Sequence, residues 1–337
     1  MSSTFSIDIS EQYTRLADLG LSKGKIELYS LGYDHTALNF YSNLTEQSAK
    51  AQANLLSKLR KELNISASSA NVVIPDALTY SQLLLMPNLP EDELVKSIRL
   101  QADEFVPLPI DDVYIDLEVI SKLKNGKLLI VFIAAQKKIV DHINMTLELA
   151  GIESETLENE LSSVGRFISE VFTFIKEPSI IVNFGFGSSS IYVMNPPFPY
   201  FQITRTTRIG FDIILRDLMA NANLASDKAF EALNTIGLNP QGSINIYATI
   251  FPVFNELIVE IEKTILMAKE KYHVQIKNIY LFNYDSHVSL LHETIQSKVS
   301  LPTQSLPLSS ILVPNSITQT FSHMLSAFIP VIATHLR

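Results

Sequence analysis

Cysteine is absent from this sequence of 337 residues, which excludes disulfide bonds and thiolate metal sites. Charged residues make up only 18% of the chain, too small a share for a disordered, solvating protein. Long apolar runs are missing too, because the longest, LLIVFIAA at 128–135, falls far short of the ~20 residues that a membrane helix needs. The opening residues, MSSTFSIDIS, have neither a basic start nor an apolar core, so we expect no secretory signal there.

Common catalytic and metal-binding motifs are also missing. The sequence contains no G-x-S-x-G, no H-E-x-x-H and no Walker A pattern. His287 and His292 are five residues apart rather than four, and no carboxylate triad accompanies them. We therefore expect neither a metal site nor catalytic residues.

Acidic residues outnumber basic ones, and the formal net charge is −9. Sequence-independent nucleic-acid binding depends on Lys and Arg neutralising phosphates, so this charge argues against it. The same charge argues against unaided docking on an anionic membrane. We expect partners other than nucleic acid and no direct membrane insertion.

Apolar residues make up 47% of the chain, and its length allows two domains with large cores. Segments of alternating or continuous apolar residues are interspersed with segments of helical spacing, which predicts an α/β protein. Strands are predicted at 5–10, 25–33, 71–75, 82–87, 113–119, 128–135, 179–184, 190–194, 200–207 and 277–283. Helices are predicted at 43–63, 138–150, 210–223, 226–236, 248–272 and 321–336, with one more starting near Pro90.

An inserted unit is predicted in the first half, at roughly 86–152. Its first helix is acidic at the start and is stopped by Pro107 and Pro109. The strand at 113–119 alternates and has one wet face. The strand at 128–135 is continuously apolar, so we expect it to be buried on both faces.

The second half opens on a glycine-rich turn between two predicted strands. In IIVNFGFGSSSIYVM, Gly185 and Gly187 flank one phenylalanine and three serines follow. Such a turn can hold a phosphate with backbone N–H groups, or it can be a tight hairpin only. The first half also begins with strand, turn and strand. Two halves of this kind suggest the actin and sugar-kinase architecture, with nucleotide between the lobes.

The segment MPNLPEDELVKSIRLQADEFVPLPIDDVYIDLEVI (86–120) resembles the type IV pilus assembly protein PilM family, which is related to the cell-division protein FtsA. Weaker similarity lies at 128–152 and in the chain end FIPVIATHLR. The resemblance implies an actin-like (ribonuclease-H-like) α/β fold of two lobes with a small inserted α+β subdomain. The implied parts are a first lobe at 1–175 with the insertion at about 86–152, a second lobe at 176–320, and a C-terminal helix at 321–337 packed on the first lobe.

Three nucleotide signatures of that family are altered in this chain. Ser10 and Arg15 replace the expected glycine and lysine, although Asp8 is present, and Asn183 replaces an aspartate. The double glycine expected against adenosine corresponds to LFNYDSH (281–287), which has no glycine. Glycine lets the backbone approach a phosphate and carboxylates hold Mg²⁺, so we expect no turnover of ATP. No cofactor is assigned, but the 185–190 turn still offers a place for a phosphate, and binding of Mg-ATP stays open. The altered nucleotide site comprises Asp8, Ser10, Arg15, Asn183, Gly185, Gly187 and Ser188.

The resemblance implies a cytoplasmic adaptor of a type IV pilus or related secretion complex. The adaptor would bind the short cytoplasmic N-terminal peptide of a bitopic PilN-like protein, which would hold it at the inner membrane. Pilus motor ATPases are further implied partners. The peptide groove is expected between the first lobe and the insertion. Residues expected to line this groove are Arg99, Glu104, Phe105, Pro107 and Pro109.

Two alternatives to an adaptor remain open at this point. An actin-like ATP-binding switch or ATPase would bind ATP saturably and with Mg²⁺. An FtsA-like filament-forming protein would give polymers in sedimentation or microscopy. The adaptor needs neither property.

Overall fold

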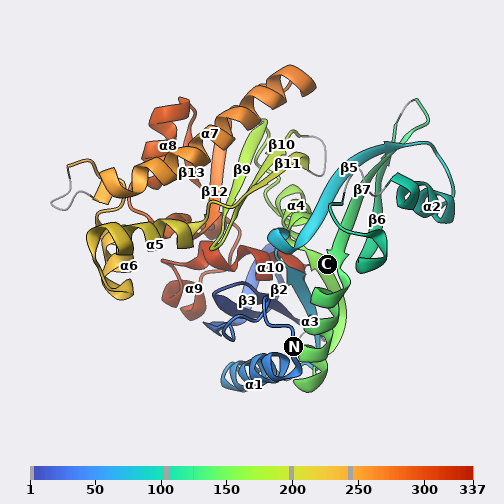
Figure 1. The fold of residues 1–337 in the computed structure, drawn as a ribbon, viewed down its shortest axis with the longest axis horizontal. Helices are drawn as coiled ribbons and strands as arrows, with labels where there is room; N and C mark the ends of the chain where they lie inside the picture. The colour runs from blue at the N-terminus through green and yellow to red at the C-terminus, as the bar shows by residue number, and fades with distance from the viewer. Residues whose placement is uncertain (1–3, 102–105, 124, 197–200, 242–245, 337) are drawn as a thin grey trace. The chain divides into compact units, whose positions relative to one another are not determined.

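The structure is a computed structural model that describes residues 4–101, 106–123, 125–196, 201–241 and 246–336 (Figure 1). The chain forms two compact units. The first comprises Met1–Leu16 and Gly32–Ser163, and the second comprises Ala17–Leu31 and Val164–Arg337. The lobe boundaries expected from the sequence stay a prediction.

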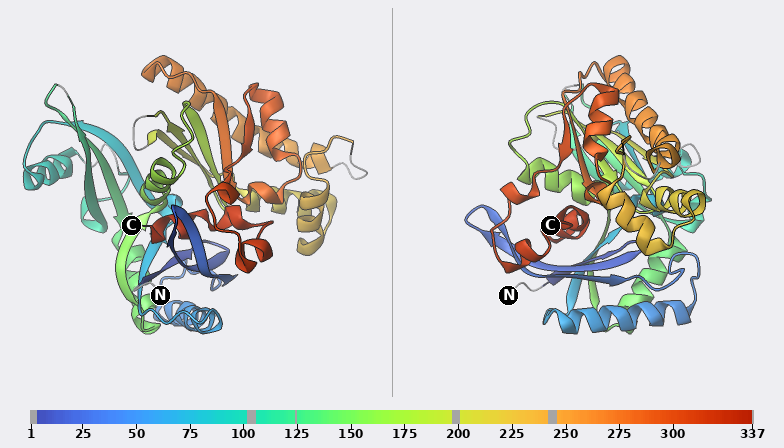
Figure 2. Two further views of the ribbon diagram at one scale, coloured as in Figure 1. Left: turned by 180° about the vertical axis from the view of Figure 1, so that it is seen from behind. Right: turned by 90° about the vertical axis from the view of Figure 1, so that its left-hand side faces the viewer.

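A five-stranded sheet of order β3-β2-β1-β4-β8 begins the chain, and β4 runs parallel to both β1 and β8. Its strands are β1 (Thr4–Ile9), β2 (Tyr13–Ser22), β3 (Lys25–His35), β4 (Ser69–Ile74) and β8 (Glu153–Asn159). Helices α1 (Glu46–Glu62) and α3 (Lys137–Leu149) lie side by side (Figures 1 and 2). Leu56 of α1 and Ile143 of α3 share one apolar core with Ile7 and Val72 of the sheet.

A three-stranded antiparallel sheet of order β5-β7-β6 overlaps the insertion predicted at about 86–152, although β5 lies almost wholly before that range and α3, within it, packs in the core of the first sheet. Its elements are β5 (Thr79–Met86), α2 (Glu91–Gln101), β6 (Val113–Lys122) and β7 (Leu128–Gln136). Helix α2 covers one face of this sheet, where Leu94 and Ile98 contact the core around Phe132 (Figure 1). The expectation that β7 is buried on both faces is wrong in part, because Leu129 and Ile133 of the other face are only half-buried.

The second unit contains another five-stranded sheet, of order β11-β10-β9-β12-β13. Its strands are β9 (Ser179–Phe184), β10 (Ser189–Met194), β11 (Phe201–Thr207), β12 (Asn278–Asn283) and β13 (Thr303–Ser305). Helices of this half are α5 (Phe211–Ala222), α6 (Ser226–Thr235), α7 (Ile246–Tyr272), α8 (Leu291–Val299), α9 (Ser316–Thr320) and α10 (Ile329–His335); α4 (Glu160–Val171) precedes β9. The long α7 packs beside α5 and against β10 and β11.

The structure differs from the sequence predictions at several elements. The elements that were not predicted are β2, β8, β13, α4, α8 and α9, and the expected single helix at 321–336 is instead a turn, a short 3₁₀ segment and α10. Pro330 lies in the first turn of α10, where a proline is tolerated because no helical N–H is needed. Within the part of the chain that the structure describes, every helix is too short or too polar to cross a membrane.

Candidate functional site

The first candidate loop joins β1 to β2, and its side chains are bound to one another. Arg15 Nη1 donates to Asp8 Oδ2 at 2.8 Å and to Ser10 Oγ at 3.1 Å. Ser10 Oγ donates in turn to the carbonyl oxygen of Tyr13 at 2.8 Å. Asp8 and Arg15 form an ion pair whose side chains are each only 2% exposed. The loop therefore brings three of the named site residues together in a closed, internal network.

Burial controls the electrostatics of this network. Removal from water raises the pKa of the Asp8 carboxyl above its ordinary value, while the charge and hydrogen bond of Arg15 pull that pKa down. Tyr41 Oη donates to the Ile9 carbonyl at 2.5 Å, and burial, reinforced by the charge of Asp8, raises the pKa of Tyr41 well above its ordinary value. Arg15 thus supplies from within the chain the positive charge that a metal ion would offer this carboxylate.

Further hydrogen bonds hold the loop from behind. Thr36 Oγ1 donates to the Ser10 carbonyl at 2.8 Å and lies 2.9 Å from Thr14 Oγ1. Gln52 of α1 donates through Nε2 to Thr14 Oγ1 at 2.7 Å and accepts from the Ala37 N–H at 2.8 Å. These contacts fix the backbone at positions 10 and 14, so Arg15 has little freedom to turn away from Asp8.

The second candidate loop, residues 185–188, joins β9 to β10 and is packed against the start of α5. The N–H groups of Phe211 and Asp212 donate to the carbonyls of Gly185 and Phe186, each at 2.9 Å. A Cβ on Gly185 would lie 2.6 Å from the Ser188 carbonyl oxygen, so only glycine permits this approach. Gly187 and Ser188 complete the turn and are half-buried. Gly185 therefore has a sufficient structural reason in the turn itself.

Asn183, where the family resemblance implies an aspartate, is the second-last residue of β9 and pairs with an asparagine of β12. Asn283 Nδ2 donates to Asn183 Oδ1 at 2.9 Å, and both side chains are buried. Asn283 has φ 82° and ψ −106°, a conformation that glycine adopts far more readily than other residues. The backbone thus has a glycine-type shape where the family is expected to have glycine, although this sequence has none there.

Aromatic side chains surround the residue that follows. Tyr284 is only 2% exposed, and its ring stacks on Phe211 with centroids 5.1 Å apart. The ring of Phe186 lies 5.7 Å from that of Tyr284, and the ring of His287 lies 5.4 Å from it. Phe230 closes the cluster against Phe211 and His287. Apolar rings therefore fill the region after β12, where the family resemblance implies contact with adenosine.

The two loops fit a magnesium–nucleotide complex poorly. Asp8 is already neutralised by Arg15, Asn183 offers a neutral amide in place of a carboxylate, and Tyr284 is packed where a bare backbone is expected. In the described part of the chain, no group of three or more His, Asp or Glu side chains is placed to hold a metal ion. The residues present therefore favour a structural role for both loops.

A buried polar cluster lies after β12 and was not predicted from the sequence. Asp285 is fully buried and accepts from Ser326 Oγ at 2.7 Å and from Ser305 Oγ at 2.5 Å. His292 Nε2 lies 3.2 Å from Asp285 Oδ2 and 3.1 Å from Ser305 Oγ. One ring nitrogen faces both groups, whereas a catalytic triad uses one nitrogen for each. The cluster joins α8, β13 and the 3₁₀ segment before α10 to the 3₁₀ segment that follows β12. Its one signal in the sequence was a carboxylate two residues after an apolar strand.

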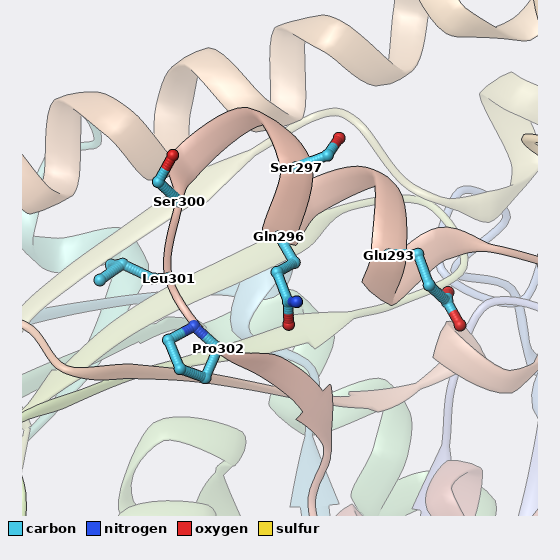
Figure 3. Close-up of a pocket in the computed structure, with 6 residues that line it drawn as sticks. All are labelled: Glu293, Gln296, Ser297, Ser300, Leu301 and Pro302. Atoms are coloured by element: carbon cyan, nitrogen blue, oxygen red, sulfur yellow. The ribbon is translucent and has the colours of Figure 1, made fainter.

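The residues expected to contact a partner lie in the insertion. Arg99 of α2, Pro107 and Pro109 are exposed, whereas Glu104 and Phe105 lie outside the described residues. A separate open pocket of about 500 Å³ lies at the end of α8 (Figure 3). Its lining residues, Glu293, Gln296, Ser297, Ser300, Leu301 and Pro302, include none of the named site residues.

Comparison with known structures places this architecture among actin-like proteins. A chain of the "PilM-PilN type IV pilus biogenesis complex" superimposes with a TM-score of 0.85 at 16% identity, covering 100% of this chain and 98% of that one. Ethanolamine utilization protein EutJ from Carboxydothermus hydrogenoformans gives 0.55 at 11% identity, covering 98% and 88%. MreB 5 of Spiroplasma citri bound to AMPPNP gives 0.52 at 9% identity, covering 99% and 95%. The predicted actin-like fold is confirmed.

Comparison with protein families gives the family directly. The sequence model described as "Type IV pilus assembly protein PilM" matches residues 6–319, which is most of the chain. The matched range includes both candidate loops and the whole insertion. This chain belongs to the type IV pilus assembly protein PilM family.

Proposed function

We propose that this chain is an adaptor that binds the short cytoplasmic N-terminal peptide of a bitopic PilN-like protein. The observation that carries the proposal is the likeness of the whole chain to a chain of the PilM-PilN complex, with a TM-score of 0.85. The inserted sheet is part of that likeness, because coverage is complete. The insertion is a good candidate for partner contact, because binding residues often lie on segments outside the scaffold of a fold.

Charge supports a protein tether at the inner membrane. A chain with a net charge of −9 is repelled by anionic lipid. Cytoplasmic segments next to membrane helices tend to be rich in Lys and Arg. An acidic adaptor and a basic tail attract each other, so the chain would be held at the cytoplasmic side through its partner. Contact with pilus motor ATPases remains a proposal that rests on the family resemblance alone.

The proposed adaptor does not turn over nucleotide. Two features support this part of the proposal: the ion pair between Asp8 and Arg15, and the packed ring of Tyr284. Phosphoryl transfer requires a metal ion and positioned donors together, whereas the Asp8 carboxylate is paired with Arg15 and position 183 offers a neutral amide. Two alternatives, an ATP-dependent switch and a filament former, are tested alongside the adaptor by Mg-ATP binding and by sedimentation.

Calorimetric titration with a synthetic peptide tests the proposal. The peptide carries the cytoplasmic N-terminal residues of the PilN-like protein encoded with this chain, and a scrambled peptide of equal composition is the control. We expect saturable binding of the native sequence only, unchanged by Mg-ATP. Absence of binding, alongside tight uptake of Mg-ATP or polymers in sedimentation, would reverse the proposal.

A further inference from the structure

The negative charge of the chain belongs to one of its two units. The first unit has 12 basic against 21 acidic residues, which gives the whole net charge of −9. The second unit has 14 of each and is formally neutral. In physiological salt a charge acts over about 8 Å, so a surface interacts through its own residues rather than through the net charge of the chain. Repulsion from anionic lipid is therefore a property of the first unit.

Two segments of the second unit meet where β9 and β12 begin. These strands are parallel neighbours, and the N–H of Lys277 donates to the Pro178 carbonyl at 2.8 Å (Figure 1). Residues 172–178, which lead from α4 into β9, therefore lie beside residues 273–277, which lead from the end of α7 into β12. We call the exposed basic and aromatic side chains of these segments and of the last turn of α7 the amino-edge surface. Its residues are Phe174, Lys176, Lys269, Lys271, Tyr272 and Lys277.

The amino-edge surface combines positive charge with exposed aromatic rings. Phe174 is 50% exposed, and Tyr272 is 40% exposed. Lys271 Nζ lies 5.5 Å from the centre of the Tyr272 ring, so a cation and a ring lie together there. All four lysines are exposed, whereas these segments contain only two acidic residues, Glu177 and Glu270. The surface therefore has an excess of positive charge.

Helix electrostatics accounts for only part of this composition. Lys269 and Lys271 complement the negative end of the α7 dipole, as basic residues in a last turn commonly do. Lys176 and Lys277 lie outside any helix, and the dipole gives no reason for an exposed Phe174. Lysine mixed with exposed aromatic residues is typical of segments at the membrane–water interface, because the rings enter the headgroup layer while the lysines meet anionic headgroups.

We propose that the amino-edge surface contacts the anionic lipid headgroups of the cytoplasmic leaflet. The proposal rests on the proposed function in one respect: the protein partner supplies the main tether, and the lipid contact adds to it. Each lysine near an anionic leaflet strengthens binding about fivefold, so this surface alone holds the chain weakly. Stable anchoring generally takes two signals. The second contact orients the second unit, with its amino-edge surface toward the leaflet.

Co-sedimentation of the protein with lipid vesicles tests the proposal. Vesicles of phosphatidylcholine alone are compared with vesicles that also contain phosphatidylglycerol, at about 0.1 M salt, where the charge of the first unit is screened. We expect binding at millimolar lipid to the anionic vesicles only. This binding should be lost at about 1 M salt, where screening reaches even close charge pairs.

Two variants remove the charge and the apolar contact separately. Lys176→Gln/Lys277→Gln should weaken binding to the anionic vesicles about 25-fold, because two charges near the leaflet are lost. The matched control is Lys50→Gln/Lys61→Gln, which removes two exposed lysines of α1 in the first unit, has the same net charge, and should bind as the wild type does. Phe174→Ser should weaken binding several-fold and leave its salt dependence unchanged, since it removes apolar contact only.

The outcomes separate this surface from the adaptor function. Wild-type protein that does not bind anionic vesicles overturns the proposal, and so does equal binding by the two double variants, which would make net charge rather than position the cause. If Lys176→Gln/Lys277→Gln changed self-association in sedimentation and kept vesicle binding, the surface would belong to a second copy, which also overturns the proposal. The vesicles contain no PilN-like protein, so a chain that binds them but not the PilN-like peptide keeps this surface and loses the adaptor function.

Discussion

Arg15 and Asp8 are each almost completely removed from water, and they are 2.8 Å apart. Removal of one partner from a buried pair leaves an uncompensated charge, which costs about 3–5 kcal/mol. We therefore expect Arg15→Met to lower the free energy of unfolding by about this amount. Urea denaturation followed by circular dichroism measures the loss.

The double variant Asp8→Asn/Arg15→Met separates pairing from packing. Because no charge is left buried, most of the stability lost in Arg15→Met should return. Equal losses of stability in the single and double variants would mean that Arg15 stabilises the fold through the packing of its side chain and not through its ion pair with Asp8.

Asn283 gives a second prediction for a single residue. Its φ of 82° is costly for any residue with a Cβ, whereas glycine adopts it freely. Asn283→Ala and Asn283→Gly both lose the hydrogen bond to Asn183, so their difference reports the backbone alone. We expect the glycine variant to be more stable than the alanine variant by about 1–2 kcal/mol in urea denaturation. Equal stabilities would show that the backbone relaxes away from this conformation.

The sequence predicted which residues of the candidate loops to examine, but not what they contact. Asp8, Ser10 and Arg15 are close in sequence, so their proximity follows from a strand–turn–strand pattern. The pairing of Asn183 with Asn283 joins residues a hundred positions apart and depends on β9 lying next to β12. Sheet order of this kind is a property of the whole fold, and a local pattern does not contain it.

At the scale of elements, the strands that escaped prediction are those with polar residues at buried positions. β2 buries Thr14, Arg15 and Asp18, which breaks the apolar pattern of a strand. Partners such as Asp8 and Thr36 compensate these groups only in the folded state. β8, with the sequence ESETLEN, has three glutamates and pairs in parallel along β4 at the edge of its sheet. By contrast, the predicted bounds of α5, α6 and α7 agree with the structure within a few residues.

His142 of helix α3 is expected to make the stability of the protein depend on pH. The side chain is 3% exposed and lies against Phe40, with ring centroids 4.7 Å apart. Burial lowers the pKa of His142, although a hydrogen bond to the Phe40 backbone opposes this shift. A lowered folded-state pKa means that the unfolded chain takes up the proton first. Stability should therefore be complete above the ordinary histidine pKa and decline as pH falls below it.

Thermal unfolding at neutral pH and at mildly acidic pH checks this expectation. His142→Phe should show a smaller loss on acidification than the wild type. His335 has a pKa lowered by burial as well and contributes a residual loss of the same sign. If His142→Phe kept the full pH dependence of the wild type, protonation of His142 would not be the cause of the loss of stability.

At the scale of the whole molecule, the family architecture is present while residues of the candidate nucleotide site, in each of the two units, make internal contacts. Arg15 pairs with Asp8 in the first unit, and the ring of Tyr284 is packed among aromatic side chains in the second. Fold and nucleotide chemistry are separable, because a fold is maintained by its core and chemistry by a few residues at loops. The shared architecture with MreB therefore does not carry ATP binding to this chain by itself.

Thermal unfolding with and without millimolar Mg-ATP tests this separation. A ligand at a hundred times its Kd stabilises the folded state by about 2.7 kcal/mol, which is a clear rise in Tm. We expect no rise, because the charge of Asp8 is already balanced within the chain. Mg-AMPPNP, which is not hydrolysed, distinguishes binding from turnover. A saturable rise in Tm with either nucleotide would mean that Arg15 releases Asp8 when nucleotide arrives, and the chain would then have to be regarded as a switch.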